Sequence, residues 1–391
     1  MVKFDRLVWV VLDSVGIGAL PDAADYDDVG RSTLGHIAES RPLRLPNLVK
    51  LGLANIASLA NLDPPLAPQA SFGKGATRSP GKDTTTGHWE MAGVWLDQAF
   101  PVYKHGFPPE IMDAFEAQIG RKTIGNKPAS GTEVIKELGE EHVRTGKPIV
   151  YTSGDSVFQI AAHEEVIPIA ELYRICEIAR KLLDGKHRVG RVIARPFTGT
   201  AGHFLRTSRR HDYAVNPPKP MLLDVLQERR VHVFGIGKIH DIYNGRGVGD
   251  YVTTKSNADG MDKLTAATRE RKNGLIFCNL VDFDMLFGHR KDVEGFARSL
   301  EEFDEALSAY LPLLGPGDLL ILTADHGCDP DPRWETTDHS REYVPILAYS
   351  PAQKSGQNLG VRSTLADMGQ TIAENFGGRI PHGESFLGQL Q

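Results

Sequence analysis

The chain has 391 residues, of which 41% are hydrophobic and 24% are charged, so it is an ordinary globular protein and not a disordered or collagen-like chain. Its 44 Lys and Arg against 50 Asp and Glu give a net charge of −6, which leaves no basic excess for a nucleic-acid partner. The three cysteines are far apart and without CxxC spacing, which favours a reducing compartment over a disulfide framework.

The first apolar run, at 7–12, is too short for a signal peptide and ends in Asp13. No segment approaches the roughly 18 apolar residues that span a bilayer. We therefore expect a cytoplasmic protein without a membrane partner.

Short aliphatic runs bounded by turn residues predict buried strands, in chain order at 7–12, 149–152, 189–194, 231–236, 275–281, 319–323 and 344–349. Helical patterns lie between them, at 171–183 and 293–314. Because the runs are continuous instead of alternating, we expect strands that helices cover on both faces. The predicted class is α/β.

Two proline-rich stretches, at 101–110 and 216–221, predict crossings between compact units. The segment between them has strand and helix patterns of its own. We expect a core domain formed by 1–100 and 220–391, with a smaller α/β cap domain inserted at 101–219.

The residues that follow the predicted strands are rich in metal ligands. In an open α/β sheet these positions meet at the carboxyl ends of the strands, where ligands bind. TADHG (323–327) comes at the end of one predicted strand, and TTDHSREYVP (336–345) leads into the last one. NLVDFDMLFGH (279–289) begins at the end of another strand, and there either Asp282 or Asp284 is the ligand candidate. The candidates are Asp13, Asp284, His289, Asp325, His326 and His339.

Three carboxylates and three imidazoles are sufficient for two divalent cations, which can clamp the oxygens of a phosphoryl transfer. Mixed Asp and His ligands suit Mn²⁺, Zn²⁺ or Fe²⁺. A nucleophile is offered by GKDTTTGHWE (81–90), where threonines precede a helical pattern. Spacing leaves open which of Thr84, Thr85 and Thr86 attacks.

Together, several motifs resemble the phosphopentomutase family of the alkaline phosphatase superfamily. The resemblance covers nearly the whole chain, and it rests on VVLDSVGIGALPDA (10–23), GKDTTTGHWEMAG (81–93), IGNKPASGTE (124–133), VDFDMLFGHR (281–290), TADHG (323–327) and TDHSREYVP (337–345). It implies an alkaline phosphatase-like core, with a mixed, largely parallel sheet between helices, and an inserted smaller α/β cap domain.

The resemblance also implies roles for individual residues. One Mn²⁺ would be held by Asp13, Asp325 and His326, and a second Mn²⁺ by Asp284, His289 and His339. Thr84, directly after Lys-Asp, would be the phosphorylated residue. The sugar phosphate would be bound by Ser153, Arg191 and Arg206 of the cap and by Lys238 of the core. Cys328, which follows TADHG, stands outside this ligand set.

The activity implied is the interconversion of α-D-ribose 1-phosphate and D-ribose 5-phosphate, and of their 2-deoxy counterparts, in nucleoside catabolism and salvage. It would pass through a phosphothreonine enzyme and a 1,5-bisphosphate. A sugar 1,6- or 1,5-bisphosphate, such as glucose 1,6-bisphosphate, would be the activator, and the family favours a monomer.

Three other functions are compatible with parts of this pattern. A metal-dependent phosphatase or phosphodiesterase would use the same core with water as acceptor, but the large inserted segment with Arg191 and Arg206 favours a mutase. A phosphoglycerate mutase of the same superfamily would by resemblance have a serine nucleophile and a longer chain. A catalytically silent metal-binding protein is disfavoured by the intact Thr84 and ligand set.

Overall fold

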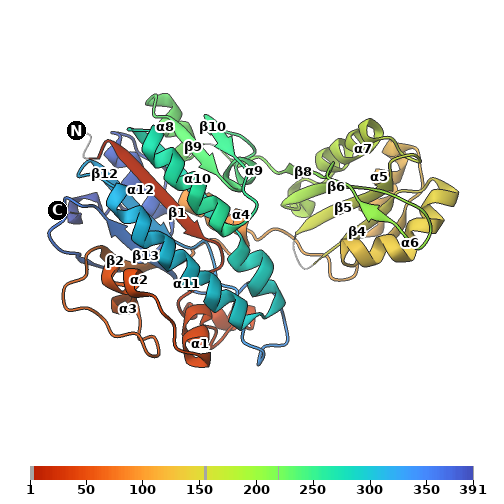
Figure 1. The fold of residues 1–391 in the computed structure, drawn as a ribbon. Helices are drawn as coiled ribbons and strands as arrows, with labels where there is room; N and C mark the ends of the chain where they lie inside the picture. Colours follow the sequence, from red (N-terminus) through yellow and green to blue (C-terminus); the bar gives the residue numbers. More distant parts are fainter. Residues whose placement is uncertain (1–3, 154–155, 219, 391) are drawn as a thin grey trace. The chain divides into compact units, whose positions relative to one another are not determined.

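The computed structural model of the chain describes residues 4–153, 156–218 and 220–390. It divides into two compact units, which we describe separately: unit 1 is Met1–Ala99 with Pro217–Gln391, and unit 2 is Phe100–Asn216. Of the inserted domain expected at 101–219, residue 219 lies outside the described residues. Each unit contains a β-sheet with helices against it (Figure 1), so the predicted α/β class is confirmed.

The sheet of unit 1 is mixed and largely parallel, as predicted. Its strands are β1 (Arg6–Leu12), β2 (Ser71–Gly75), β9 (Val233–Ile236), β10 (Asp250–Val252), β11 (Gly274–Leu280), β12 (Asp318–Thr323), β13 (Val344–Tyr349) and β14 (Asn358–Arg362). They lie in the order β10, β9, β11, β1, β12, β13, β2, β14. The strands from β10 to β12 are parallel, β13 is antiparallel to both neighbours, and β14 is parallel to β2.

The three central strands β11, β1 and β12 are buried at every residue. Helices cover the sheet, so neither face of these strands meets water, and this explains why their apolar runs are continuous. Trp9 of β1 stacks on Phe277 of β11 with ring centroids 4.5 Å apart. The sheet therefore presents rigid strand ends to the segments that follow them.

The α-helices of unit 1 are α1 (Thr33–Ser40), α2 (Pro46–Leu51), α3 (Leu53–Ile56), α4 (Thr84–Met91), α8 (Leu222–Glu228), α9 (Ile239–Ile242), α10 (Asn257–Glu270), α11 (Val293–Tyr310) and α12 (Ala366–Asn375). Single turns are η1 (Ala23–Tyr26), η3 (Phe283–Phe287, a π turn), η4 (Gly288–Arg290), η5 (Leu311–Leu313) and η6 (Leu387–Gln389). The helix predicted at 293–314 ends at Tyr310 and continues as the turn η5. This turn contains Pro312, which has no backbone N–H to donate to a helical hydrogen bond. Among the described residues, no helix is both long and apolar enough to cross a membrane.

Unit 2 is a smaller sheet with helices on both faces. Its strands are β3 (Ile124–Pro128), β4 (Ile149–Thr152), β5 (Val157–His163), β6 (Arg191–Thr198), β7 (Leu205–Arg206) and β8 (His211–Ala214), with α5 (Pro109–Ile119), α6 (Gly131–Thr145), α7 (Ile169–Leu182) and the turn η2 (Gly185–His187). The order is β3, β4, β5, β6, β7, and β8 pairs with β6. The strand predicted at 189–194 extends further, because the ladder with β5 continues as far as Phe197.

Residues alternate between the two faces of this sheet. Val150 and Phe158 pack in a cluster with residues of α5 and α7, whereas Tyr151 packs with Val134 and Ile135 of α6. The helix α6 therefore covers one face and α5 with α7 cover the other. Phe197 of β6 packs in the same cluster as Tyr151 and therefore also lies on the α6 face.

A buried ion pair fastens the beginning of β1. Arg6 donates from Nε to Asp318 Oδ1 at 2.9 Å and from Nη2 to Asp318 Oδ2 at 2.5 Å, and its Nη1 donates to the carbonyl oxygens of Thr268 and Arg271. Both partners of the ion pair are buried. We predict that Arg6→Met lowers the free energy of unfolding by about 3–5 kcal/mol, because it leaves the Asp318 carboxylate buried and unpaired. Urea denaturation followed by tryptophan fluorescence would measure this.

The double variant Arg6→Met with Asp318→Leu is the control for that prediction. Replacing both charges by apolar side chains removes the unpaired carboxylate, so the double variant should be more stable than Arg6→Met alone. Equal stability of the two variants would contradict the explanation.

Unit 2 contains a buried histidine that resists protonation. His142 Nδ1 donates to the carbonyl oxygen of Lys147 at 2.7 Å, and its Nε2 accepts the backbone N–H of His163 at 2.8 Å. Burial lowers the pKa of His142 below its ordinary value of 6.5. The unfolded chain therefore binds a proton more readily than the folded chain, and this part of the stability is present above pH 6.5 and is lost as the pH falls.

We predict that His142→Gln reduces the loss of stability between pH 6.5 and pH 5, although it lowers stability at neutral pH by removing a packed ring. Unfolding midpoints of both proteins across that range would test it. Parallel pH profiles would show that His142 does not contribute.

Candidate metal centre

Three adjacent strands deliver three carboxylates to one edge of the unit 1 sheet. Asp13 follows β1, Asp325 follows β12, and Asp284 lies in η3 after β11. The backbone N–H of Asp13 donates to the carbonyl oxygen of Leu280, the last residue of β11, at 3.1 Å. Since β11, β1 and β12 are parallel neighbours, their carboxyl ends meet, and the three side chains meet with them.

The first group of potential ligand atoms comes from Asp13, Asp325 and His326, whose ligand atoms lie within 4.8 Å of one another. His326 Nε2 is 3.4 Å from Asp13 Oδ1 and 3.4 Å from Asp325 Oδ2. All three side chains are buried. The structure thus brings together the three residues that the resemblance assigns to one metal ion.

A second group lies beside the first. Asp284, His326 and His339 offer ligand atoms within 4.8 Å, and His339 Nε2 is 3.3 Å from Asp284 Oδ1. His289 Nε2 lies 3.4 Å from the other oxygen, Asp284 Oδ2. Asp284 therefore contacts both histidines assigned to the second ion, and His326 belongs to both groups.

The donor set fits divalent cations. Carbonyl oxygens can only accept, so the contacts of His326 Nδ1 with Gly327 O at 3.1 Å and of His289 Nδ1 with Thr337 O at 2.7 Å place the proton on Nδ1. Each Nε2 then directs a lone pair at the carboxylates. The separations of 3.3–3.4 Å match those of two ligands on one tetrahedral ion, about 3.4 Å for bonds of about 2.1 Å.

Buried carboxylate oxygens provide a second test of the fit. Among the described residues, Asp284 Oδ1 and Asp325 Oδ2 have no hydrogen-bond partner of normal geometry. An unsatisfied buried carboxylate oxygen is costly, and a cation would satisfy it. The site is therefore suited to hold metal ions.

The charges of the cluster oppose one another. Burial raises the pKa of Asp13 well above its ordinary value, and the charges of Asp325 and Asp284 raise it further. Burial also opposes ionisation of Asp325 and Asp284, but nearby imidazoles outweigh it and hold the pKa of both carboxyls below the ordinary value. Burial lowers the pKa of His326. Without cations the group resists carrying three full negative charges, and cations would remove this resistance.

The structure separates the two aspartates between which the sequence could not choose. The chain leaves β11 at Leu280 and turns into η3, so that Asp282 and Asp284 no longer share a strand face. Asp282 Oδ2 accepts the backbone N–H of Asn257 at 2.7 Å, and the Asp282 N–H donates to Asn257 Oδ1 at 3.0 Å. Asp282 thus fastens α10, while Asp284 joins the cluster.

Cys328 is not among the metal ligands that the resemblance implies, but it lies beside the cluster. Its Sγ is within 4.8 Å of ligand atoms of Asp284 and His289. Burial raises the pKa of the thiol well above its ordinary value, and a neutral thiol is a weaker ligand than an imidazole.

Sequence reasoning missed two polar side chains that support the cluster. Asn279 Nδ2 donates to Asp13 Oδ2 at 2.9 Å. His88 of α4 donates from Nδ1 to the carbonyl oxygen of Thr84 at 2.9 Å, and the same nitrogen lies 3.1 Å from Asp325 Oδ2. Both residues lie within the motifs at 279–289 and 81–90, but the sequence around a buried asparagine or histidine does not indicate which residue it contacts.

The helix α4 places a hydroxyl at the cluster. Thr84, its first residue, has Oγ1 3.3 Å from His326 Nε2 and 3.5 Å from Asp13 Oδ1. The Thr86 hydroxyl donates to Asp83 Oδ2 at 2.6 Å, and Asp83 caps the helix. The threonines that spacing could not separate therefore have different surroundings.

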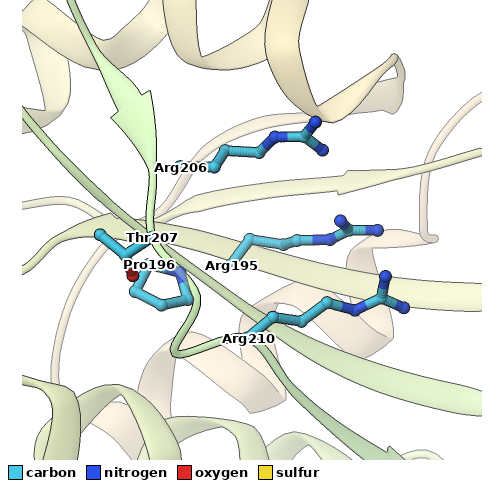
Figure 2. A pocket seen from close by; sticks show the side chains of 5 residues that line it. All are labelled: Arg195, Pro196, Arg206, Thr207 and Arg210. Atoms are coloured by element: carbon cyan, nitrogen blue, oxygen red, sulfur yellow. The ribbon is translucent and has the colours of Figure 1, made fainter. Parts of the chain in front are cut away.

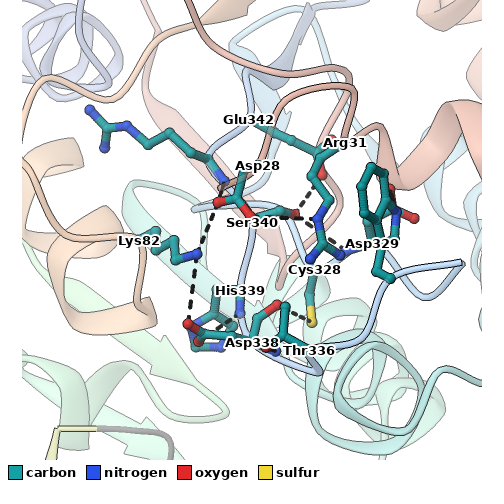
Figure 3. A network of polar contacts seen from close by, with 12 residues as sticks. Asp28, Arg31, Lys82, Cys328, Asp329, Thr336, Asp338, His339, Ser340 and Glu342 are labelled. Carbon is teal, nitrogen blue, oxygen red and sulfur yellow. Dashed lines mark hydrogen bonds and ion pairs between the residues drawn. The ribbon is translucent and has the colours of Figure 1, made fainter. Parts of the chain in front are cut away.

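Polar contacts fasten the loop before α4 to the segment that carries His339 (Figure 3). Lys82 Nζ donates to Asp28 Oδ2 at 2.9 Å and lies 3.6 Å from Asp338 Oδ2. Asp28 Oδ2 also accepts the backbone N–H of Arg341 at 2.9 Å. Segments far apart in the sequence are thus held in one arrangement around the cluster.

Two motif glycines are explained by a buried glutamate. Glu342 accepts from the Thr33 and Ser340 hydroxyls at 2.7 and 2.6 Å. A Cβ at Gly16 or at Gly327 would lie 2.4 Å from a Glu342 oxygen. The backbone at Gly327 has no positive φ, so close approach is the reason for the glycine there.

The residues assigned to the sugar phosphate are divided between the units. Lys238 follows β9 in unit 1, and its charge acts on Asp13. Ser153 follows β4, Arg191 begins β6, and Arg206 ends β7, all in unit 2. Arg191 Nη1 lies 3.5 Å from Asp212 Oδ2.

Comparisons with known proteins agree with a metal site. Residues 5–379 match the sequence model of the Metalloenzyme superfamily. The chain is 59% identical over 387 residues to the phosphopentomutase of Desulfitobacterium hafniense, covering 98% of this chain and 99% of that protein. It is 56% identical over 386 residues to the phosphopentomutase of Caldanaerobacter subterraneus, covering 98% of each chain. It is also 56% identical to the phosphopentomutase of Dictyoglomus thermophilum over 388 residues, 99% of this chain and 98% of that protein.

We predict that Asp284→Asn weakens Mn²⁺ binding by at least about 100-fold, because it removes a charge that contacts two of the imidazoles. Titration of Mn²⁺ into chelator-treated protein, followed by calorimetry, would measure this.

Asp282→Asn is the matched control, because Asp282 is equally buried two residues away and bonds to Asn257 instead. It should lower stability and leave Mn²⁺ affinity within about threefold. Equal effects of the two variants on Mn²⁺ affinity would contradict the assignment of Asp284.

Proposed function

This chain belongs to the phosphopentomutase family, and from that membership we propose its substrates and its chemical steps. The family makes it an isomerase that acts as an intramolecular phosphotransferase on pentose phosphates. In our proposal it interconverts α-D-ribose 1-phosphate and D-ribose 5-phosphate, and the corresponding 2-deoxyribose phosphates.

Thr84 is the proposed nucleophile. The observation that carries the proposal is the position of its Oγ1, 3.3 Å from His326 Nε2 and 3.5 Å from Asp13 Oδ1, at the first residue of α4. The amino end of a helix favours a bound phosphoryl group, because unpaired N–H groups point toward it. Thr86 is disfavoured because its hydroxyl is engaged by Asp83.

The proposed reaction has two transfers. In the first, the bond between phosphorus and Thr84 Oγ breaks, a bond between phosphorus and a sugar oxygen forms, and the proton of that sugar hydroxyl is returned to Thr84 Oγ. The product is a 1,5-bisphosphate. In the second, its other phosphoryl group passes to Thr84 Oγ, which loses a proton to the departing sugar oxygen. A sugar bisphosphate such as glucose 1,6-bisphosphate would phosphorylate Thr84 initially.

Two Mn²⁺ ions are the proposed metals, one held by Asp13, Asp325 and His326 and the other by Asp284, His289 and His339. When bound, they would neutralise negative charge that develops on the phosphoryl oxygens. Asp13 and His326 would orient the Thr84 hydroxyl. The carbonyl oxygens of Gly327 and Thr337 fix the tautomers of the imidazoles.

The cap at 101–219 is the proposed holder of the sugar phosphate, through Ser153, Arg191 and Arg206, with Lys238 contributed by the core. Guanidinium groups suit this task because they offer paired donors to phosphate oxygens and stay charged at all relevant pH values. Holding a bisphosphate is what separates a mutase from a phosphatase, in which water accepts the phosphoryl group.

We predict that ³¹P NMR of ribose 5-phosphate with Mn²⁺, a trace of glucose 1,6-bisphosphate and this protein shows a ribose 1-phosphate signal that reaches a constant ratio. Thr84→Ala should lower the rate by at least about 1,000-fold, because removal of a nucleophile from a site whose groups act together removes most of the catalysis. The matched control is Thr85→Ala, which should keep the rate within about tenfold.

Steady release of inorganic phosphate would contradict the mutase proposal and favour a phosphatase. Equal losses in Thr84→Ala and Thr85→Ala would contradict the choice of nucleophile.

A further inference from the structure

Cys328 lies where one side of the metal cluster meets the turn that carries His289. The backbone N–H of Cys328 donates to Thr33 Oγ1 at 3.1 Å and to the carbonyl oxygen of Ser14 at 3.2 Å. Its side chain is buried, and the thiol donates to the carbonyl oxygen of Asp338 at 3.9 Å (Figure 3). The backbone contacts therefore fix the sulfur beside the cluster, while a long hydrogen bond holds the thiol proton only weakly.

Three potential ligand atoms converge on this side of the cluster. Cys328 Sγ, a carboxylate oxygen of Asp284 and a ring nitrogen of His289 all lie within 4.8 Å of one another. A sulfur and a nitrogen bound to one tetrahedral Zn²⁺ are about 3.6 Å apart, for bonds of about 2.3 and 2.1 Å. The remaining difference is small enough for rotation of the side chains to close it.

The residue before His289 permits this close approach. A Cβ at Gly288 would lie 2.8 Å from Cys328 Sγ, and the backbone at Gly288 has no positive φ. Contact with Cys328 is therefore the reason for glycine at this position. The side chain of His289 is 31% exposed, which gives a cation a path from solvent to the three ligand atoms.

The Asp284 carboxylate independently indicates a missing cation. Asp284 is only 7% exposed, and its Oδ1 has no hydrogen-bond partner among the described residues. Its Oδ2 lies 3.4 Å from His289 Nε2, while the proton of that ring is on Nδ1, so that two lone pairs face each other. A cation between these two atoms would replace their repulsion by two attractive contacts.

The two oxygens of Asp284 lie beside different partners. Oδ1 is 3.3 Å from His339 Nε2, in the group that also includes His326. Oδ2 is on the side of His289, which forms a group with Cys328. Asp284 therefore lies between two cation positions, one completed by imidazoles and the other by an imidazole and a thiol.

The thiol changes which cation the second position favours. Thiolates are soft ligands that select Zn²⁺ and similar ions, whereas carboxylates suit Mn²⁺. When a soft cation binds Cys328, the S–H bond breaks, its proton passes to water, and a bond forms between sulfur and the metal. Mn²⁺ has less affinity for sulfur and would leave the thiol protonated.

We propose that Asp284, His289 and Cys328 form a thiolate-containing binding position for Zn²⁺. This position uses two residues assigned to the second Mn²⁺ ion, so Zn²⁺ and Mn²⁺ compete for them. The competition rests on the proposed assignment of the Mn²⁺ ligands, whereas the position itself does not depend on the mutase reaction. Cys328 thus makes the metal content of the centre sensitive to the supply of soft cations.

Cd²⁺ is the probe, because it shares the preference of Zn²⁺ for thiolates and its bond to a thiolate absorbs ultraviolet light. We predict that Cd²⁺, titrated into the reduced and chelator-treated full chain, gives a charge-transfer band that saturates. Cys328→Ala should abolish the band, and so should Cys328→Ser, which keeps the size of the side chain. Asp284→Asn should raise the Cd²⁺ concentration at the midpoint by at least about tenfold, and its control Asp282→Asn by less than about threefold.

Cys176→Ala is the matched control for the thiol, because Cys176 is an equally buried cysteine in α7 of unit 2. Unit 2 also has a pocket whose arginines would repel a cation (Figure 2). The residues that line this pocket offer no thiol, imidazole or carboxylate, since they are Arg195, Pro196, Arg206, Thr207 and Arg210. Cys176→Ala should therefore keep both the band and its midpoint.

Competition with other cations tests the identity of the position. Mn²⁺ at ten times its dissociation constant should raise the Cd²⁺ midpoint by about tenfold, and an unshifted midpoint would contradict the sharing of ligands. Excess Zn²⁺ should displace Cd²⁺ and remove the band. A band that survives excess Zn²⁺ would contradict the assignment to Zn²⁺.

No band in the unaltered chain, or an undiminished band in Cys328→Ala, would overturn the proposal. Circular dichroism of each variant would exclude unfolding as the cause of a lost band. The titration needs neither sugar phosphate nor turnover, so absence of mutase activity would contradict the proposed function separately from the existence of the thiolate position.

Discussion

Mutual repulsion of three enclosed carboxylates is the constraint on which the rest of the site depends. Asp13, Asp284 and Asp325 are all buried at the ends of adjacent parallel strands, where burial penalises their charge. Imidazoles lie 3.3–3.4 Å from their oxygens and hold the pKa of Asp284 and Asp325 below the ordinary value, but the pKa of Asp13 stays raised. Divalent cations would satisfy this arrangement, and the strands that position it are buried at every residue.

Irregular segments carry most of the ligand candidates, and other buried polar groups hold those segments in place. Glu342 connects the loop after β1, the start of α1 and the segment that carries His339. Gly16 and Gly327 stand where a side chain would collide with that carboxylate. A Cβ at Gly87 would likewise lie 2.4 Å from the carbonyl oxygen of Asp325, so α4 can bring Thr84 to the cluster only with glycine there. These glycines serve the site through close approach.

The sequence predicted those parts of the fold in which both faces of a strand are buried. The run at 344–349 coincides with β13, and the runs that predict β1, β11 and β12 differ from them by single residues. Strand β5 was not predicted because Gln159 interrupts its apolar run, and the partner of Gln159, Arg195, is 36 residues away. Strands β2 and β14 contain Gly73 and Gly360, which weaken the strand pattern but permit close contact between the two backbones. The sequence predicts the six ligand candidates because they stand in motifs that follow or precede apolar strands, whereas the contacts of His88 and Asn279 depend on tertiary packing.

The two proposed phosphate sites differ in a way that a mutase requires. In the proposed mechanism, phosphoryl transfer takes place at the buried cluster beside Thr84, where bound cations would neutralise charge and the Thr84 hydroxyl would be the nucleophile. In that mechanism the sugar must also exchange its two ends, so the phosphate that is not transferred would have to be held and then released. Arg206 of the cap is exposed, and water would screen its attraction for a phosphate. Such a site would bind firmly enough to orient the sugar and weakly enough to let it turn.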